Sequence, residues 1–264
     1  MLSMAANSRW LRSVGEWMPV LELRSDITDV VYVNYLVEAS RLEPFVPAGL
    51  ELQRLGPGGR YALFTFLTYT HHHFGPALLG LRRLFPSPVQ SNWRTYVRDP
   101  RTGQEGIYFV HNAVTTAVHA LGGRLLAEGV SMHLLGKGEV TRTADGSVSL
   151  TLDPAGGTAP DARAVLRPTT DRTLASPWSE CFASYDELLL YDVPQDRAMA
   201  TLPWRRCTSR QEIHLGIPLD TAVPLEGVVE SSAARAIVGD SATPLSFYVP
   251  AVPFRLKGEE IDAW

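Results

Sequence analysis

Polar residues at alternate positions run through the segment 90–97 (QSNWRTYV). Side chains two apart on a strand share a face, so Gln90, Asn92, Arg94 and Tyr96 are expected to line one side. Arg94 could hold a carboxylate or enolate there, Tyr96 could donate a hydrogen bond, and the two amides could bind a carbonyl oxygen. We predict Arg94 and Tyr96 as catalytic and Gln90 and Asn92 as substrate-binding. The alternative is an arginine that fixes an inner network or a subunit contact.

A second group of candidates follows the glycine pair at 122–123, which we interpret as a turn. Glu128 comes three residues before Ser131, and burial in an apolar pocket would raise its pKa and suit it to proton transfer. We predict Glu128 and Ser131 as catalytic and Arg124 as substrate-binding. The alternative is an exposed glutamate at a turn.

Histidines offer a third chemistry, because the run 71–73 (HHH) could bind a metal or transfer protons. On an extended chain only the first and third would share a face, and no acidic residue lies nearby in sequence. We therefore predict no metal site and interpret the run as hydrogen-bonded or solvated, with a general acid or base as the alternative. Tyr108 and His111, on the strand that follows Arg94, are predicted to bind substrate.

Other classes of function find little support in the sequence. The net charge is -4 in 264 residues and no block of five like charges occurs, so neither nucleic acid nor an anionic membrane is an expected partner. Phosphate-binding loops, dinucleotide fingerprints, zinc-finger spacings and a G-x-S-x-G elbow are all absent, and we predict no cofactor. Residues 1–20 do not resemble a signal peptide, and no stretch of 18 apolar residues occurs, which predicts a cytoplasmic protein.

Closely spaced strands and few helices must position these residues. The fold class predicted is α+β, with a largely antiparallel curved sheet closed into a β-barrel or cone around a ligand cavity. We expect one domain over residues 1–264. Strands are predicted at 27–37, 60–71, 92–98, 106–111, 139–143 and 147–153, and helical turns at 38–45, 78–85 and near 176–186.

The first half of the chain resembles the acetoacetate decarboxylase superfamily. The similarity rests on residues 34–38 (NYLVE), 46–52 (VPAGLEL), 90–97 (QSNWRTYV) and 106–109 (GIYF), and on 122–124 (GGR). The Asn-x-Arg-Thr-Tyr-Val and Gly-x-x-Phe patterns are most similar to a sister family, domain of unknown function 2071. This resemblance implies a barrel or cone with a mostly apolar substrate pocket, and an assembly of at least two subunits.

The resemblance also implies that this chain lacks the catalytic lysine, glutamate and arginine of the decarboxylase branch. In the decarboxylase branch a desolvated lysine forms a Schiff base with a β-keto acid, helped by a glutamate and an arginine. Those three positions correspond here to Ser131, Gln90 and Thr28. The chain has two lysines, Lys137 and Lys257, and Lys137 lies between glycines in what we interpret as a turn. We therefore expect chemistry without a lysine Schiff base.

Three functions remain open on the sequence alone. The leading hypothesis is a cofactor-independent enzyme of the lyase or isomerase type, acting on a small carbonyl-containing or polyketide-like molecule. The second is a small-molecule-binding barrel that has lost the decarboxylase site. A metal-dependent hydrolase or lyase built on the histidine run is the third.

Overall fold

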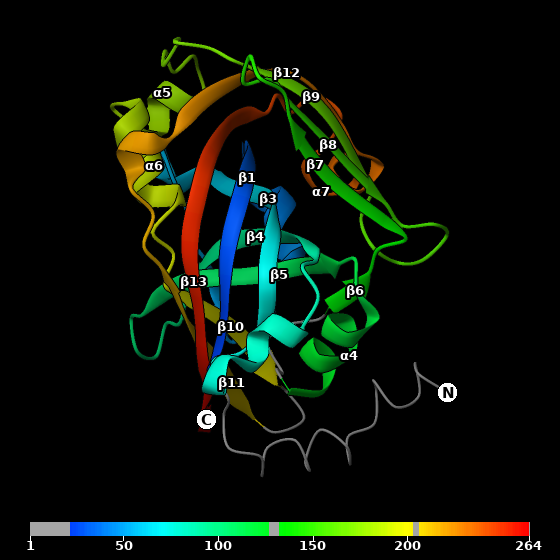
Figure 1. The fold of residues 1–264 in the computed structure, drawn as a ribbon. Helices are drawn as coiled ribbons and strands as arrows, with labels where there is room; N and C mark the ends of the chain where they lie inside the picture. The colour runs from blue at the N-terminus through cyan, green and yellow to red at the C-terminus, as the bar shows by residue number, and fades with distance from the viewer. Residues whose placement is uncertain (1–21, 127–131, 203–205, 264) are drawn as a thin grey trace.

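The computed structural model describes residues 22–126, 132–202 and 206–263 (Figure 1). Residues 1–21, 127–131, 203–205 and 264 are not described. The signal-peptide prediction therefore concerns residues outside the described chain. None of the helices in the described chain has the length and apolar character needed to cross a membrane.

Thirteen strands form one mixed sheet, most of whose pairings are antiparallel. Seven of these strands form a ring. The ring closes because β13, the seventh strand, pairs both with β11 and with β1. The link between β5 and β10 consists of a single parallel residue pair, Ile107 with Ala198. In order, the ring strands are β1 (Leu23–Glu38), β3 (Tyr61–Pro76), β4 (Val89–Arg98), β5 (Glu105–Val114), β10 (Arg197–Leu202), β11 (Cys207–Leu215) and β13 (Leu245–Ala263).

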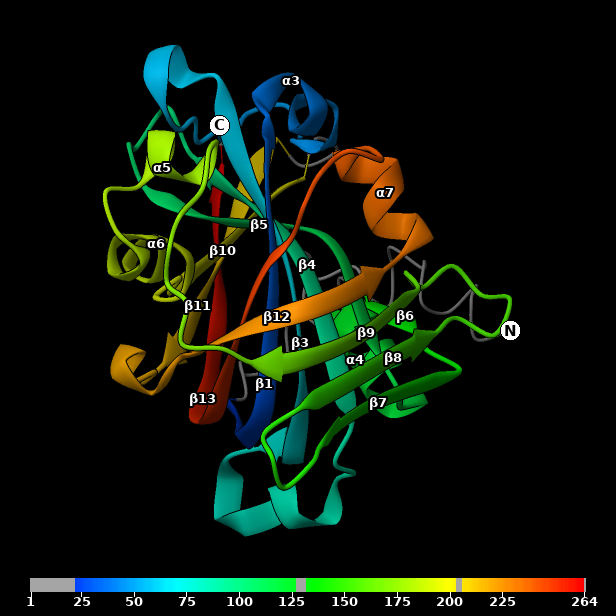
Figure 2. The ribbon, with the colours of Figure 1, turned by 90° about the horizontal axis from the view of Figure 1, so that it is seen from above.

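The sheet continues beyond β13 into four strands that cross over the outer face of β1 and β3 (Figure 2). They are β12 (Val223–Glu230), β9 (Ala162–Pro168), β8 (Val148–Asp153) and β7 (Lys137–Arg142). Two short strands pair at the sides, β2 (Glu51–Leu52) with β4 and β6 (Met132–Leu134) with β5.

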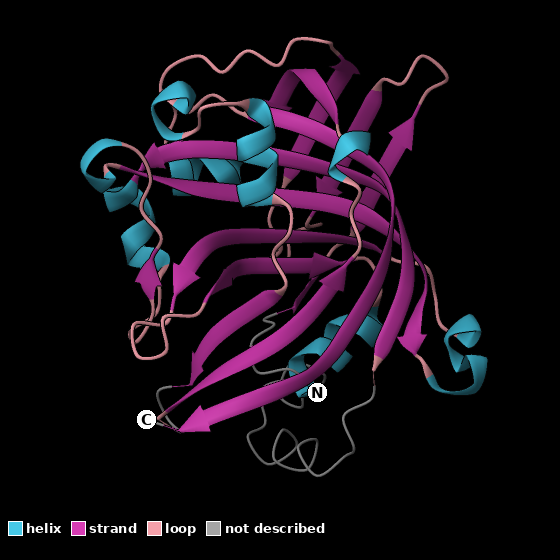
Figure 3. Cartoon of the chain, turned by 90° about the vertical axis from the view of Figure 1, so that its left-hand side faces the viewer, coloured by secondary structure: helices cyan, strands magenta, loops and turns pink. Residues whose placement is uncertain are grey.

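Helices are short and lie around the strands (Figure 3). The α-helices are α3 (Ala39–Leu42), α4 (Ala117–Leu126), α5 (Trp178–Cys181), α6 (Tyr185–Asp192) and α7 (Ser232–Val238). Four 3₁₀ segments accompany them: η1 (Glu43–Phe45), η2 (Pro57–Gly59), η3 (Leu78–Leu84) and η4 (Leu219–Thr221). Helix α6 begins where the Ser184 hydroxyl accepts a hydrogen bond from the backbone N–H of Glu187 at 3.1 Å.

Two apolar cores follow from the alternation of side chains along β1, β3 and β4. Residues such as Tyr32, Leu63 and Ile107 face inward and pack with α5, α6 and β13. Residues on the other face, such as Val33 and Trp93, pack against β7–β9 and α7. The central parts of β1 and β3 are thus buried on both faces, which explains their almost continuous hydrophobic runs.

The predicted elements agree with the structure in most of the first half of the chain. A mostly antiparallel sheet with few short helices is confirmed, as are the strands and the hairpin between β7 and β8. Two interpretations were wrong. Gly122 and Gly123 lie inside α4 rather than in a turn, and Lys137 is the first residue of strand β7. Helix α7 was not predicted at all.

Candidate functional site

Strand β4 carries the predicted polar row on the inner face of the ring. Gln90, Arg94 and Tyr96 are buried and Asn92 is half-buried. The register with β3 places Arg94 opposite Thr65, so both side chains lie on the same face. The prediction that the four side chains share one side is confirmed by their contacts, which all involve inward-facing partners.

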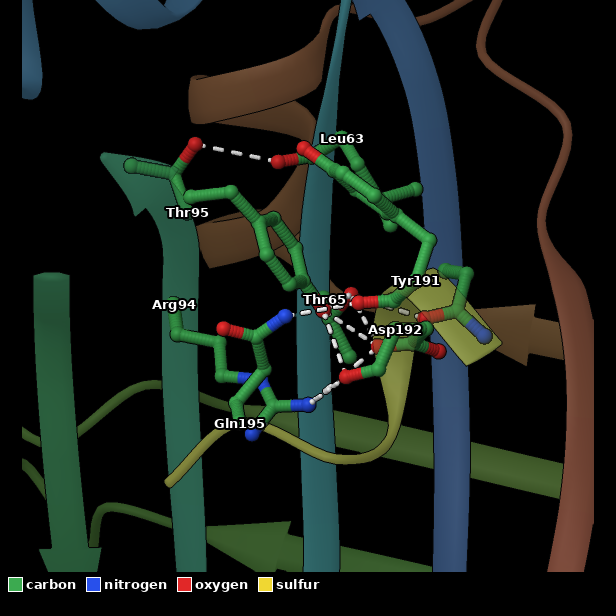
Figure 4. A network of polar contacts seen from close by, with 9 residues as sticks. Leu63, Thr65, Arg94, Thr95, Tyr191, Asp192 and Gln195 are labelled. Atoms are coloured by element: carbon green, nitrogen blue, oxygen red, sulfur yellow. Dashed lines mark hydrogen bonds and ion pairs between the residues drawn. The ribbon is translucent and has the colours of Figure 1, made fainter. Parts of the chain in front are cut away.

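A buried carboxylate from a distant helix completes the centre of this row. Asp192, the last residue of α6, has no exposed surface. Arg94 Nη2 donates to its backbone carbonyl at 2.7 Å and to its Oδ1 atom at 3.2 Å. The Tyr96 hydroxyl donates to the same Oδ1, and dashed lines in Figure 4 join Asp192 to Thr65 and to Arg94. The structure thus joins Arg94, Tyr96 and Asp192 in one network.

Two polar side chains of β1 and β3 extend the network. The Thr65 hydroxyl lies 2.7 Å from Asn34 Oδ1, 3.2 Å from the Tyr96 hydroxyl and 3.4 Å from Asp192 Oδ1. Asn34 and Thr65 are fully buried, and each lies between two apolar residues of its strand. Such polar side chains are retained in a core when they are hydrogen-bonded.

Burial shifts the pKa values of the ionisable side chains in this network, as is common at functional sites. Burial raises the pKa of the Asp192 carboxyl above its ordinary value, although Arg94 and the hydrogen bonds from Tyr96 oppose the shift. Burial also raises the pKa of Tyr96 well above its usual range, so the phenol stays protonated. A buried ion pair contributes little net stability compared with apolar packing, and perturbed groups of this kind concentrate at functional sites.

A second chain of hydrogen bonds lies at the start of β4. His71 Nε2 is 3.0 Å from Gln90 Oε1, the Gln90 amide donates to Asn92 Oδ1 at 2.8 Å, and Asn92 Nδ2 donates to the Tyr69 hydroxyl at 2.9 Å. His71 is fully buried, and burial lowers its pKa to about 3, so the ring is neutral. Gln90 and Asn92, predicted to bind substrate, here orient a histidine.

Several buried polar atoms along this inner face have no hydrogen-bond partner among the described residues. Leaving a buried donor or acceptor unpaired costs about 1–3 kcal/mol, so a concentration of them on one face is unusual. They are the Tyr32 hydroxyl, Asn34 Nδ2, His71 Nδ1, Arg94 Nε, both amide atoms of Asn112, the Tyr185 hydroxyl and Asp192 Oδ2.

Three predicted substrate-binding residues are not brought to this network. Tyr108 packs beside Leu50 and Val97 on the opposite face of β5. The His111 ring lies 5.6 Å from that of His133, and Arg124 Nε donates to the backbone carbonyl of Met132. A bulge between Trp93 and Arg94 in the β4–β5 register places His111 beside Trp93, which faces outward.

The histidine run does not converge on one point. His73 has a positive φ of 52°, at an irregularity in the pairing of β1 with β3, so it does not share the face of His71 as an extended chain would. His72 and His73 are exposed while His71 is buried. No cluster of three or more His, Cys, Asp or Glu side chains suited to a metal occurs within the described residues.

Other predicted residues take no part in the described site. Glu128 and Ser131 lie outside the described residues, so their predicted roles stay predictions. The Lys137 side chain is 63% exposed and pairs with Glu139 at 2.8 Å on the outer sheet. Lys257 lies on β13, and nothing is described of its side chain.

The sequence reasoning missed Asp192, Asn34, Thr65 and Asn112. For Asn34 and Thr65 a signal was available, because each is a polar residue inside a run of β-branched and aromatic residues. Asp192 ends a short helix just before Val193 and Pro194, where an acidic residue has no special meaning by itself. Its significance depends on a contact across 98 positions of the chain.

A surface cleft is lined in part by Tyr191, the residue before Asp192. Its volume is about 740 Å³, and its lining includes Glu51, Arg98 and Tyr191. The Tyr191 hydroxyl donates to Gln53 Oε1 at 3.0 Å, and its ring lies 5.0 Å from that of Tyr96. Tyr191 thus contacts both the cleft and the Tyr96 ring of the network.

The chain matches the model of the DUF2071 family, described as an uncharacterized conserved protein. The match covers residues 24–176, more than half of the 264 residues. It includes β1, β3, β4 and β5, which carry most of the inner polar face. No curated protein sequence matches the chain.

Solved structures match over almost the whole chain. Acetoacetate decarboxylase from Legionella pneumophila superposes with a TM-score of 0.63 at 15% identity, covering 93% of this chain and 88% of that one. An acetoacetate decarboxylase-like enzyme from Sphingomonas wittichii RW1 gives 0.60 at 11% identity, covering 91% and 93%. The enduracididine biosynthesis enzyme MppR, complexed with pyruvate, gives 0.59 at 15% identity, covering 93% and 91%. At these identities the likeness shows a shared fold.

Proposed function

Because the chain belongs to the DUF2071 family and shares its fold with acetoacetate decarboxylase, we propose that it is a cofactor-independent enzyme of the lyase or isomerase type. It binds a small carbonyl-containing molecule, such as a keto acid or a polyketide-like compound, at the polar inner face of the strand ring. The observation that carries the proposal is the buried network of Arg94, Asp192 and Tyr96 on the inner face.

The network supplies the groups that proton transfer next to a carbonyl requires. Asp192 Oδ2, unpartnered among the described residues, removes a proton from the carbon beside the carbonyl, so a C–H bond breaks and a carboxyl O–H bond forms. The electron pair moves onto the carbonyl oxygen, and the enolate is stabilised by Arg94 Nε and the Tyr32 hydroxyl. In an enolate conjugated with a further C=C bond, return of the proton to the γ-carbon completes an isomerisation. In a lyase reaction the bond from the β-carbon to the leaving group breaks instead, and the group departs with the electron pair and takes the proton held by Asp192.

Tyr96 and Thr65 position the base in this scheme. Both hydroxyls lie against Asp192 Oδ1, which leaves the Oδ2 atom for the substrate. Arg94 contacts both the base and the substrate in this scheme. Its Nη2 atom binds Asp192, and its buried Nε atom, which has no partner among the described residues, is left for the enolate oxygen. Preorganised charges of this kind lower a barrier because they need no rearrangement during the reaction.

A lysine Schiff base is not part of the proposal. Lys137 is exposed on the outer sheet. By the correspondence expected from the sequence, Ser131 takes the position of the decarboxylase lysine. Glu128 and Ser131 keep their predicted catalytic roles as part of this proposal. The homo-oligomeric state also stays a prediction, and light scattering of the purified protein tests it.

Deuterium exchange in D₂O tests the reaction without knowledge of the natural product. The protein is incubated with pyruvate, phenylpyruvate and acetoacetate, and proton NMR follows loss of the C–H signal beside the carbonyl above the buffer rate. We expect exchange with at least one keto acid and a loss of roughly 10²-fold or more in Asp192→Asn. Asp240→Asn, at an exposed position, is the matched control.

A binding protein without catalysis is the second candidate, favoured by the interior packing of Asp192 against its partners. Calorimetric binding of keto acids with no exchange above the buffer rate would support it and overturn the enzyme proposal. Borohydride reduction during turnover gives an independent check. A covalent adduct on Lys137 or Lys257 would contradict chemistry without a Schiff base.

A further inference from the structure

We infer that the surface cleft beside Tyr191 is a binding site for an organic amine, with Glu105 as the counter-charge of its ammonium group. This inference goes beyond the proposed function and does not depend on it, because Glu105 takes no part in the network around Asp192. The ligand that the cleft calls for carries one positive charge on an apolar body.

The cleft has the size and part of the lining of a small-molecule site. Its volume of about 740 Å³ lies within the range of about 300–1,000 Å³ that is typical of such sites. Apolar residues of one segment, together with the strand β2 inside it, line one part of the cleft, and they can pack against the body of a ligand. They are Val46, Pro47, Ala48, Leu50, Leu52 and Leu55.

The charged residues of the lining leave one carboxylate over. Glu43 pairs with Arg54, and Glu51 pairs with Arg98 at 3.0 Å. The strand register places Arg98 between two carboxylates, since it lies opposite Glu51 of β2 on one side and opposite Glu105 of β5 on the other. Directly opposed side chains share a face, with Cβ atoms about 4.5–5.5 Å apart. One guanidinium group thus stands between two carboxylates and pairs with the first.

Glu105 is the carboxylate without a cation. Within the described ranges of the chain, no arginine, lysine or histidine forms an ion pair with it. Burial raises the pKa of the Tyr191 phenol, and the negative charge of Glu105 adds to the shift, which places this carboxylate near Tyr191. The Tyr191 hydroxyl donates to Gln53 Oε1 at 3.0 Å and so does not compensate Glu105. The cleft therefore has one free negative charge at the side of Tyr191.

An ammonium group fits this arrangement better than a metal ion does. Calcium takes six to eight oxygen ligands, and magnesium needs a near-ideal octahedron, so a single free carboxylate is too few. No group of three or more possible metal ligands occurs in the described part of the chain. An amine on an apolar body uses both the carboxylate and the apolar wall, and its N–H groups form charge-assisted hydrogen bonds to Glu105.

The test uses two probes of similar size and shape, phenethylamine and 2-phenylethanol. At pH 7 the amine is a cation, as the amine of lysine is, and the alcohol is neutral. Dissociation constants are measured on the full chain at 20 mM NaCl from ¹H–¹⁵N NMR titrations, which also show where each probe binds. We expect the amine to bind about fivefold more tightly, as one partly exposed ion pair allows, with shifts at the residues of the cleft. The preference should shrink at 500 mM NaCl because salt screens the pair.

Three variants at exposed positions test the charges in opposite directions. In Glu105→Gln the preference for the amine falls to within about twofold, while 2-phenylethanol binds as before. In Arg98→Gln, where the altered side chain is 52% exposed, Glu51 loses its cation and the preference rises above that of the wild-type protein. Asp240→Asn, an exposed acid outside the cleft, keeps the wild-type preference and is the matched control.

The outcomes that overturn the inference are equally definite. Equal binding of the two probes by the wild-type protein, binding of neither, or NMR shifts confined to residues outside the cleft each overturn the site. A preference that survives in Glu105→Gln overturns Glu105 as the counter-charge. Deuterium exchange of keto acids tests the proposed function separately, so either proposal can fail while the other stands.

Discussion

Arg94 on strand β4 lies 2.7 Å from the backbone carbonyl of Asp192 at the end of helix α6, and 3.2 Å from its carboxylate, across 98 positions of the chain. This contact docks the helix onto the inner face of the ring. The cation also sits where the last carbonyl groups of a helix carry partial negative charge. One arginine therefore combines a structural contact with the charge that the proposed chemistry needs.

Breaking this pair from either side is expected to destabilise the protein strongly. Arg94→Met leaves a buried carboxylate without its cation, and Asp192→Leu leaves the cation without its carboxylate, each at a cost of about 3–5 kcal/mol. The double variant removes both charges, so its cost is expected to fall well below the sum of the two. Urea unfolding of the three variants measures the coupling, and additivity within about 0.5 kcal/mol would contradict a direct interaction.

The pH dependence of exchange is expected to report the raised pKa of Asp192. Its carboxylate must be ionised to accept a proton, and burial raises its pKa above the ordinary value for aspartate, near 3.9. The rate of deuterium exchange should therefore rise with pH through a midpoint above that value. Exchange measured by NMR from pH 3.5 to 8 locates the midpoint. A midpoint at or below the ordinary value would assign the base to another group.

Strands β1 and β3 of the ring could be predicted because their sequences contain long runs of β-branched and aromatic residues. Arg94 and Tyr96 could be assigned to one face because alternation is a local property of a strand. Helix α4 was missed because the pair Gly122 and Gly123 has low helix propensity, and packing of the helix against β6 overrides that preference.

The centre of the site could not be predicted, for a different reason. Asp192 acquires its role only when the ring closes and α6 packs on it, so no local pattern marks it. The position of His71 depends on the irregular pairing at His73, which changes the alternation. The placement of His111 depends in the same way on the bulge beside Arg94. A shift of one residue moves a side chain to the other face of a sheet.

Buried His71 is expected to make the protein less stable as the pH falls below about 6.5. Burial lowers its folded-state pKa to about 3, so between these values the unfolded chain binds a proton that the folded protein does not. Stability therefore rises with pH in this window, by up to about 1.4 kcal/mol per pH unit from this group. Urea unfolding at pH 4, 5, 6 and 7 should show a shallower dependence in His71→Phe than in the wild-type protein. Identical slopes would contradict a buried neutral ring.

Asp99, at the turn after β4, is expected to make the stability of the protein depend on pH at more acidic values than His71 does. Its carboxylate accepts hydrogen bonds from Arg101 at 2.8–3.0 Å and from Arg210 at 3.1 Å, and these lower its pKa to about 2. The resulting stabilisation is present above about pH 4 and is lost as the pH falls towards 2. Asp99→Asn should remove on the order of 2 kcal/mol at neutral pH and much less at pH 2.5. Asp240→Asn serves as the exposed control, and an equal effect at both pH values would contradict the assignment.

Gly106 is expected to be important for stability, because it lies where β5 and β10 pair through a single residue pair. A Cβ atom there would lie 2.5 Å from the backbone carbonyl oxygen of Arg197 and 3.3 Å from Met199 Cε, so β5 and β10 approach closely only because this residue is glycine. The two strands share one residue pair, Ile107 with Ala198, so a side chain that pushed them apart would break the pairing that closes the ring here. Gly106→Ala should cost about 1–3 kcal/mol of unfolding free energy in urea. Gly122→Ala is the matched control with the opposite sign, because a Cβ there meets nothing within 4 Å and alanine favours the helix by about 1 kcal/mol. If both alanine variants were neutral, the close approach of the two strands would not limit the closure of the ring.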